Sequence, residues 1–189
     1  AQAMAANAPG VAPRDLDATR DLASFDIAAF LARRVPVTQI AARHTVGLVD
    51  AIDAADRPVD APDDGLPCTL EEVVERYGQR HFKLKLGGDA GADLTRLHKI
   101  SILLARHAEL ITLDGNEQYP DAAVFADFLD QFEAAPALAL LRSKVAFVEQ
   151  PIRRDQTLHC DVSTLARRMP LLVDESDSTL RSFLQARAV

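Results

Sequence analysis

Four short apolar stretches, each ending in a charged residue, constrain the fold of this chain more than any other feature. The charged residues lie 29, 35 and 25 positions apart, close to the ~30 residues of one strand–helix–strand unit. They are Lys85, Asp114, Glu149 and Asp174. Stretches that are almost wholly apolar are typical of strands buried on both faces. With helix-like segments between them, they predict a parallel sheet with helical crossovers.

The first of these stretches, residues 81–86, alternates apolar and charged side chains. Side chains on a strand alternate between its two faces, so Lys83 and Lys85 share one face. Taken alone, the pattern indicates an ordinary half-buried strand with its lysines in water. The three downstream acids change this interpretation, because the carboxyl ends of parallel strands form one active face.

Helix signals fit between the strands. Thr69 followed by Glu72 predicts a capping box at a helix start. Further helices are expected over residues 90–107, 121–134 and 162–168. Counting a first strand near residues 45–49, the pattern gives about five βα units.

Composition excludes several classes of protein. The 189 residues carry a net charge of −7, which argues against a nucleic-acid binder, since such proteins need a basic face. No apolar run approaches the ~20 residues of a membrane span. Cys68 and Cys160 match no metal-binding spacing and are expected to be buried free thiols. The first 13 residues lack the pattern of a secretion signal, so we expect a cytoplasmic protein.

Three carboxylates that converge from neighbouring strand ends need a cation, because like charges at close range oppose ionisation. Hard oxygen ligands suit Mg²⁺, with Mn²⁺ as the alternative ion. Since none of these positions holds a His or a Cys, zinc is not expected. A lysine beside a second lysine and a divalent cation is expected to have a lowered pKa, as a general base requires.

At this point the chain resembles the enolase superfamily, in which a lysine base is paired with Mg²⁺. Four motifs carry the resemblance, in the family's order, over about residues 40–189. They are Lys83-Leu84-Lys85, Asp114-Gly115-Asn116, Glu149-Gln150-Pro151 and Asp174-Glu175-Ser176. The combination is most similar to the muconate lactonizing enzyme and dipeptide epimerase branch, with the mandelate racemase branch as its relative.

The resemblance implies a role for each motif residue. Asp114, Glu149 and Asp174 would be the Mg²⁺ ligands. Adjacent Glu175 is the alternative third ligand, since the mandelate racemase branch uses a Glu there; we favour Asp174.

The lysines and the asparagine would serve the same reaction. Lys85 would abstract the α-proton of a small carboxylate substrate, giving a metal-stabilised enediolate. Lys83 would tune Lys85 or contact the substrate carboxylate, and Asn116 would support the metal site. Racemases or epimerases, cycloisomerases and dehydratases all share this step, so the resemblance implies an isomerase or lyase.

The resemblance also implies an eight-stranded (β/α)₈, TIM-like barrel with a capping domain. We expect residues 1–35 to be the helical end of that capping domain and residues 36–189 to form barrel strands one to five. The sixth strand, which carries a second lysine in this branch, would begin past Val189. Five strands cannot close a barrel, so we expect a part of a longer protein, which could form a homo-oligomer at full length.

Two alternatives stay open. One is a protein that keeps the metal site but has lost the chemistry, because half of the pocket lies outside the chain. The other is an open doubly wound sheet such as a phosphoacceptor receiver, which also gathers acids and a lysine at strand ends. Receivers carry a pair of acids after their first strand, and the run Leu48-Val49-Asp50 lacks that pair.

Overall fold

The computed structural model describes residues 26–179 and 182–186. Within these residues the chain divides into two units. One lies within Ala1–Ile40 and Asp177–Ala188, and the other lies within Ala41–Ser176. All residues of the candidate site belong to the second unit.

The first unit contains two short helices, α2 (Ile27–Ala32) and α9 (Ser182–Ala186). Helix α2 begins after Asp26, whose side chain accepts a hydrogen bond from the Ala29 N–H at 2.8 Å. This satisfies one of the N–H groups that a helix start leaves without an internal partner.

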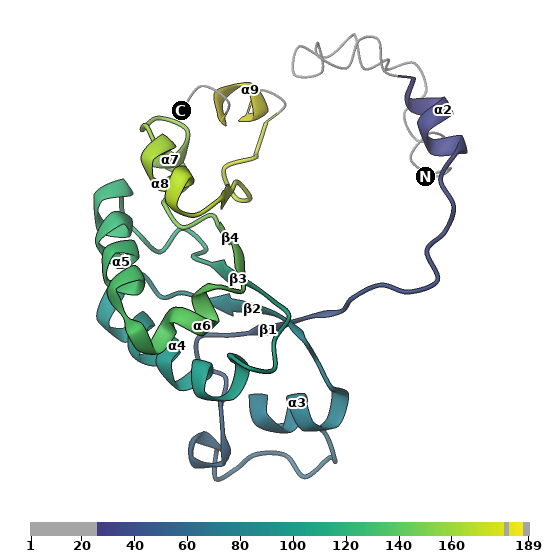
Figure 1. The fold of residues 1–189 in the computed structure, drawn as a ribbon, viewed down its shortest axis with the longest axis vertical. Coiled ribbons are helices and arrows are strands. Elements are labelled where there is room, and N and C mark those ends of the chain that lie inside the picture. The colour runs from purple at the N-terminus through teal and green to yellow at the C-terminus, as the bar shows by residue number, and fades with distance from the viewer. Residues whose placement is uncertain (1–25, 180–181, 187–189) are drawn as a thin grey trace. The chain divides into compact units, whose positions relative to one another are not determined.

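The second unit is built on five parallel strands, whose order across the sheet is their order along the chain (Figure 1). The strands are β1 (Arg43–Val46), β2 (His81–Lys85), β3 (Leu110–Asp114), β4 (Val145–Glu149) and β5 (Leu171–Leu172). Sequential order is that of a TIM-type barrel, whereas strand order reverses at the switch point of a doubly wound sheet. The predicted α/β fold, part of a TIM-like barrel, is therefore confirmed, and a receiver-like fold is excluded.

Helices connect the strands, and Figure 1 shows α4, α5 and α6 along one side of the sheet. The helices are α3 (Leu70–Tyr77), α4 (Ala90–Leu104), α5 (Ala122–Ala134), α6 (Ala139–Arg142), α7 (Arg154–Thr157) and α8 (Ser163–Arg168), with 3₁₀ helices η3 (Ala54–Asp56) and η4 (Pro136–Leu138). The predicted capping box is present: Thr69 accepts from the Glu72 N–H, and the Glu72 carboxylate accepts from the Thr69 N–H. Among the helices of the described ranges, none is both long and apolar enough to cross a bilayer.

The core lies between the sheet and these helices. Phe82 and Leu84 of β2 are fully buried, and the two lysines that alternate with them face the other way. Aromatic rings from α5 stack beneath the sheet, with Phe128 and Phe132 5.6 Å apart at a 10° interplanar angle. Burying such rings removes a large apolar area from water and stabilises the sheet–helix layer.

Two details differ from the sequence predictions. Strand β5 ends at Leu172, two residues before Asp174, because the Asp174 N–H bonds to the side chain of Gln150 at 3.0 Å and not to a carbonyl of β4. Cys68 and Cys160 are free, as expected, but each is partly exposed. Their position in loops, away from the aromatic core, explains the exposure.

Candidate active site

The strand register brings the predicted charged residues together at the carboxyl end of the sheet. Lys85 of β2 is paired with Asp114 of β3, and Asp114 is paired with Glu149 of β4. Neighbouring parallel strands lie about 4.8 Å apart, so the three side chains share one small region. The prediction that these residues converge at the strand ends agrees with this register.

Both lysines contact the carboxylates directly. The Lys83 Nζ lies 2.6 Å from Asp114 Oδ2 and 2.8 Å from Glu149 Oε1, and the Lys85 Nζ lies 2.6 Å from the same Asp114 oxygen. The Asp114 side chain has no exposed surface. Charge-assisted bonds of this length are the strong ones, so the carboxylates are held by ammonium groups in this arrangement.

The pairing shifts two pKa values. Burial of the Lys83 ammonium acts to lower its pKa, but hydrogen bonds and charges from Asp114 and Glu149 outweigh burial and raise the pKa above its usual value. Burial acts to raise the pKa of Asp114, while bonds from the two lysines and from the Asn116 N–H hold it below its usual value. The lowered lysine pKa expected beside a divalent cation stays a prediction, since the charges nearest to Lys83 here are the two carboxylates.

Asn116 connects the lysine strand to the fifth strand. Its Oδ1 accepts a hydrogen bond from the Lys85 Nζ, and its backbone N–H donates to Asp114 Oδ1 at 3.0 Å. Its Nδ2 donates to Glu175 Oε1 at 2.7 Å. Asn116 has a φ of 39°, a left-handed conformation that Asn tolerates better than most residues. The side chain predicted as a supporting group thus touches the candidate base and an acid after β5.

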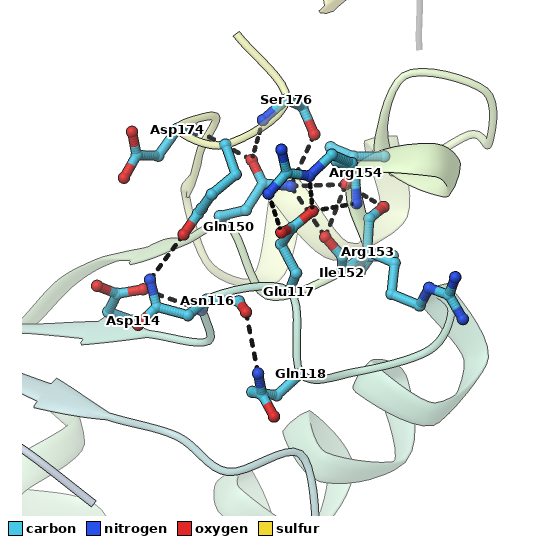
Figure 2. Close-up of polar contacts among 12 residues, drawn as sticks. Asp114, Asn116, Glu117, Gln118, Gln150, Ile152, Arg153, Arg154, Asp174 and Ser176 are labelled. Atoms are coloured by element: carbon cyan, nitrogen blue, oxygen red, sulfur yellow. Dashed lines mark hydrogen bonds and ion pairs between the residues drawn. The ribbon is translucent and has the colours of Figure 1, made fainter. Parts of the chain in front are cut away.

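The two acids after β5 lie differently. Asp174 is exposed, and Figure 2 shows its carboxylate pointing away from the Gln150 amide. Glu175 is half-buried and reaches Asn116 through Oε1, while its Oε2 is buried without a hydrogen-bond partner. An unpaired buried carboxylate oxygen is costly. The structure therefore brings Glu175 to the Asn116 side of the site, and the choice of Asp174 as third ligand stays a prediction.

The donor set fits a hard divalent cation in its chemistry. Asp114 and Glu149 are adjacent carboxylates, and Glu175, whose Oε2 is unpartnered, is linked to Asp114 by hydrogen bonds through Asn116. Mg²⁺ takes such oxygen ligands and completes its octahedron with water or substrate. Over residues 26–179 and 182–186, however, no three His, Cys, Asp or Glu side chains are grouped as a metal site. In this arrangement the Lys83 Nζ lies between the Asp114 and Glu149 carboxylates and contacts both.

The loops at the carboxyl end of the sheet approach one another closely at two glycines. Gly88 has a φ of 85°, and a Cβ there would lie 2.5 Å from the Gln118 carbonyl oxygen. At Gly115 a Cβ would lie 2.5 Å from the Pro151 Cα. Side chains cannot be accommodated at such distances, so glycine is required where these loops cross.

A buried carboxylate anchors the loop after the lysine strand. Asp93 of α4 accepts hydrogen bonds from the N–H groups of Gly87 and Gly88 at 2.7 and 3.0 Å, and from the Tyr119 hydroxyl at 2.7 Å. Burial, followed by the hydrogen bond to Asp93, raises the pKa of Tyr119 far above its usual value. Through Asp93, the glycine pair Gly87-Gly88 is tied to Tyr119 in the loop after β3.

Sequence reasoning missed two polar groups of this region. Arg154 donates to Glu117 from its backbone N–H and from its guanidinium, with distances of 2.7, 2.7 and 2.5 Å (Figure 2). Gln150, quoted only as the middle of a motif, is fully buried with five side-chain contacts. The only indication in the sequence that Gln150 is important was its place between Glu149 and Pro151. Nothing in the sequence indicated that Glu117 and Arg154 form a pair.

An open surface cavity of about 620 Å³ lies elsewhere, between the loop after β1 and helix α4. Its lining includes Asp50, Asp56, Arg96 and Lys99, and none of the predicted site residues. The lysine–carboxylate contacts, and not this cavity, therefore identify the candidate site.

Three solved structures are similar to this chain, and the first of them supports the fold. An enolase from Bradyrhizobium, solved with magnesium and mandelic acid, is similar with a TM-score of 0.55 at 21% identity, over 90% of this chain and 44% of that one. A mandelate racemase/muconate lactonizing protein from Herpetosiphon aurantiacus gives a TM-score of 0.49 at 24% identity, over 61% of this chain and 31% of that one. A dipeptide epimerase from Methylococcus capsulatus, solved with a Mg ion, gives 0.46 at 27% identity, over 72% and 33%.

The chain thus spans less than half the length of each of these structures. No curated protein matches it. The model of the enolase C-terminal domain-like family matches residues 68–188, well over half of the chain and all four strand-end motifs. The chain belongs to the enolase C-terminal domain-like family.

Proposed function

We propose that this chain supplies the proton-abstracting half of an active site that removes the α-proton of a small carboxylate substrate with the help of Mg²⁺. In this reaction the C–H bond breaks and its proton passes to the Lys85 Nζ, which must first give up the proton that it carries as the ammonium group bound to Asp114. The electron pair of that bond delocalises into the substrate carboxylate. Racemisation or epimerisation, cycloisomerisation and dehydration all begin in this way.

One observation carries the proposal: Lys85, Asp114 and Glu149 are register neighbours at the carboxyl ends of three adjacent parallel strands. Proton abstraction beside a cation needs a base and carboxylates that hold the cation, and this arrangement provides both. In barrels of this type the catalytic groups stand at this end of the strands. Family membership supports the same assignment.

The chain's own residues divide the work. Asp114 Oδ2 and Asn116 Oδ1 hold the Lys85 Nζ between them, which fixes the position of the base. Lys83 lies against Glu149 and Asp114 and is suited to keep their charges balanced or to meet the substrate carboxylate. Preorganised groups of this kind lower the barrier because little rearrangement is left for the reaction.

Asp114, Glu149 and one carboxylate after β5 would hold the ion, with Asp174 as the favoured third ligand and Glu175 as the alternative. When bound, Mg²⁺ supplies positive charge opposite the negative charge that develops on the substrate. The magnesium in the Bradyrhizobium and Methylococcus structures is consistent with this choice.

A second candidate function is metal binding without turnover. It is favoured by the lysine contacts, because the Nζ atoms of Lys83 and Lys85 are both engaged with the Asp114 carboxylate in this structure and are not directed to a substrate. The two candidates differ in proton exchange and agree in Mg²⁺ binding.

The test is exchange of the substrate α-proton in heavy water, followed by ¹H NMR, with mandelate and a dipeptide as probes. We expect loss of the α-proton signal only when the chain and Mg²⁺ are both present. Lys85→Ala should slow exchange by about 10²- to 10⁴-fold, the usual contribution of a general base. Lys99→Ala is the matched control, because Lys99 is a surface lysine paired with Asp53 and Asp56.

Equal exchange by Lys85→Ala and the unaltered chain would refute the role of Lys85. An absence of exchange together with Mg²⁺ binding would select the second candidate.

A further inference from the structure

Gln150 is a buried polar residue at the carboxyl end of β4, next to Glu149. Its side chain has no exposed surface, and its φ is 35°. A left-handed conformation is uncommon outside glycine and is maintained only when its surroundings determine it. The backbone of Gln150 also joins neighbouring loops: its N–H donates to the Leu172 carbonyl, and its carbonyl accepts from the Glu117 N–H, each at 2.8 Å.

Past the end of β5, the side-chain oxygen of Gln150 accepts the hydrogen bonds that a backbone carbonyl would accept within a sheet. Oε1 accepts hydrogen bonds from the backbone N–H groups of Asp174 at 3.0 Å and Ser176 at 3.1 Å (Figure 2). Two N–H donors require an acceptor, so the orientation of the amide is determined. Both donors lie past the end of β5, which ends at Leu172.

The amide nitrogen is anchored on the opposite side. Nε2 lies 2.9 Å from the Ile152 carbonyl, 2.9 Å from Thr157 Oγ1 and 2.8 Å from Ser176 Oγ. An NH₂ group has two hydrogens, so the three acceptors share them. All of these partners are buried, and a buried amide held on both sides has very little rotational freedom.

This anchoring determines which way the acids after β5 face. The residues on each side of Glu175 donate to a single oxygen, which fixes the backbone around that residue. Glu175 then reaches Asn116 at 2.7 Å, and Asn116 in turn contacts the Lys85 Nζ. Asp174 is left exposed on the other side of the turn.

We propose that Gln150 is a positioning residue: through the Asp174 and Ser176 N–H groups, it fixes the Asp174–Glu175 pair relative to Asn116 and the Lys85 base. The role of Gln150 in Mg²⁺ binding rests on the proposed function. Its role in fixing the backbone of residues 174–176 is independent of that function. Neither role requires Gln150 to touch substrate or metal.

The test combines amide hydrogen exchange by NMR with titration of the 189-residue chain by Mg²⁺ alone. In the unaltered chain, the Asp174 and Ser176 amides should be protected although they lie outside a strand. Gln150→Met, similar in length and unable to accept these bonds, should speed their exchange at least on the order of tenfold. It should also weaken Mg²⁺ binding by about 10- to 100-fold, as loss of a group that orients metal ligands does.

Two controls separate positioning from general destabilisation. Gln131→Met makes the same change on the exposed surface of α5 and should alter neither readout. Leu129→Ala removes a fully buried side chain of α5, so it should lower the melting temperature and leave Mg²⁺ affinity unchanged.

Rapid exchange of both amides in the unaltered chain would overturn the proposal, and this measurement does not depend on how a variant folds. Unchanged exchange in a folded Gln150→Met chain, or an equal loss of Mg²⁺ affinity in Leu129→Ala, would also overturn it. If the unaltered chain binds no Mg²⁺ while Gln150→Met exposes the two amides, the fixed backbone stands and the proposed function fails.

Discussion

Strand β2 contributes alternate residues to two different environments. Phe82 and Leu84 enter an apolar layer against the helices, where aromatic rings of α5 pack beneath the sheet. Lys83 and Lys85 face the other way and meet carboxylates from the next two strands. One strand therefore supports the fold with one face and the candidate chemistry with the other.

The two regions are stabilised differently. Each side chain of the helix-covered layer has many apolar neighbours, so its contribution comes from area and packing density. At the carboxyl end, single directional contacts hold single groups, such as the Asn116 bridge between Lys85 and Glu175. Substitutions in the apolar layer should chiefly lower stability, whereas substitutions at the carboxyl end should chiefly alter binding.

The largest effect on stability is expected in the apolar layer. Phe128→Ala removes a ring with no exposed surface from the aromatic row of α5. The free energy of unfolding should fall by about 3–5 kcal/mol, through lost burial and a residual cavity. Urea unfolding followed by circular dichroism measures this loss. A loss below about 1 kcal/mol would contradict the packing described for this layer.

A smaller loss is expected from the buried acid of the site. Asp114→Asn keeps the shape of the side chain and removes the charge that two lysines share. Weakening these charge-assisted bonds should cost roughly 1.5–3 kcal/mol of unfolding free energy. Chemical unfolding at neutral pH checks the value. A variant more stable than the parent would show that desolvation of Asp114 exceeds the benefit of the pair.

Two glycines with positive φ give a matched comparison between the crowded carboxyl end and an open helix end. Gly88→Ala introduces a Cβ at a φ of 85° and 2.5 Å from the Gln118 carbonyl oxygen, so we expect a loss of about 1–3 kcal/mol. Gly78→Ala, at the end of α3, meets strain at a φ of 60° and no atom within 4 Å. It should therefore cost less in the same thermal unfolding experiment. Equal losses of stability in the two variants would mean that the loop at Gln118 moves to accommodate the new Cβ without an energetic cost.

The smallest effect is expected for the exposed ion pair. Arg154 holds the pKa of Glu117 below its ordinary value of 4.5, so the pair stabilises the fold at a pH above that value and loses this effect as the pH falls through the folded-state pKa. Glu117→Gln should cost about 0.2–1 kcal/mol near pH 7. The difference from the parent should vanish in acid. A difference that persists at low pH would assign the effect to something other than charge.

The parts of this architecture that depend on chain periodicity were predictable from sequence. The ~30-residue spacing of Lys85, Asp114 and Glu149 follows from repeated βα units, and parallel register then places the three side by side. The alternation in β2 likewise assigns its lysines and apolar residues to opposite faces. The Thr69 capping box was readable because its contacts are local.

Contacts that depend on side-chain reach across loops were not predictable. The sequence predicted that β5 ends at Asp174, but the strand ends at Leu172, because the Asp174 N–H bonds to the Gln150 side chain and not to a backbone carbonyl of β4. No sequence pattern indicates such a side-chain contact. The pairing of Glu117 with Arg154 joins loops 37 residues apart. The raised pKa of Lys83 depends on the distances to two carboxylates, which spacing along the chain does not give.

Mg²⁺ titration of the full chain by isothermal calorimetry tests the central claim most directly, namely that the acids at the strand ends form one metal site. We expect one ion per chain and more than about tenfold weaker binding by Glu149→Gln, since even groups behind the ligands contribute 10- to 100-fold. Glu109→Gln, at a surface acid paired with Arg80, should bind as the parent does. Binding unaffected by Glu149→Gln, or no binding by the parent, would contradict the account.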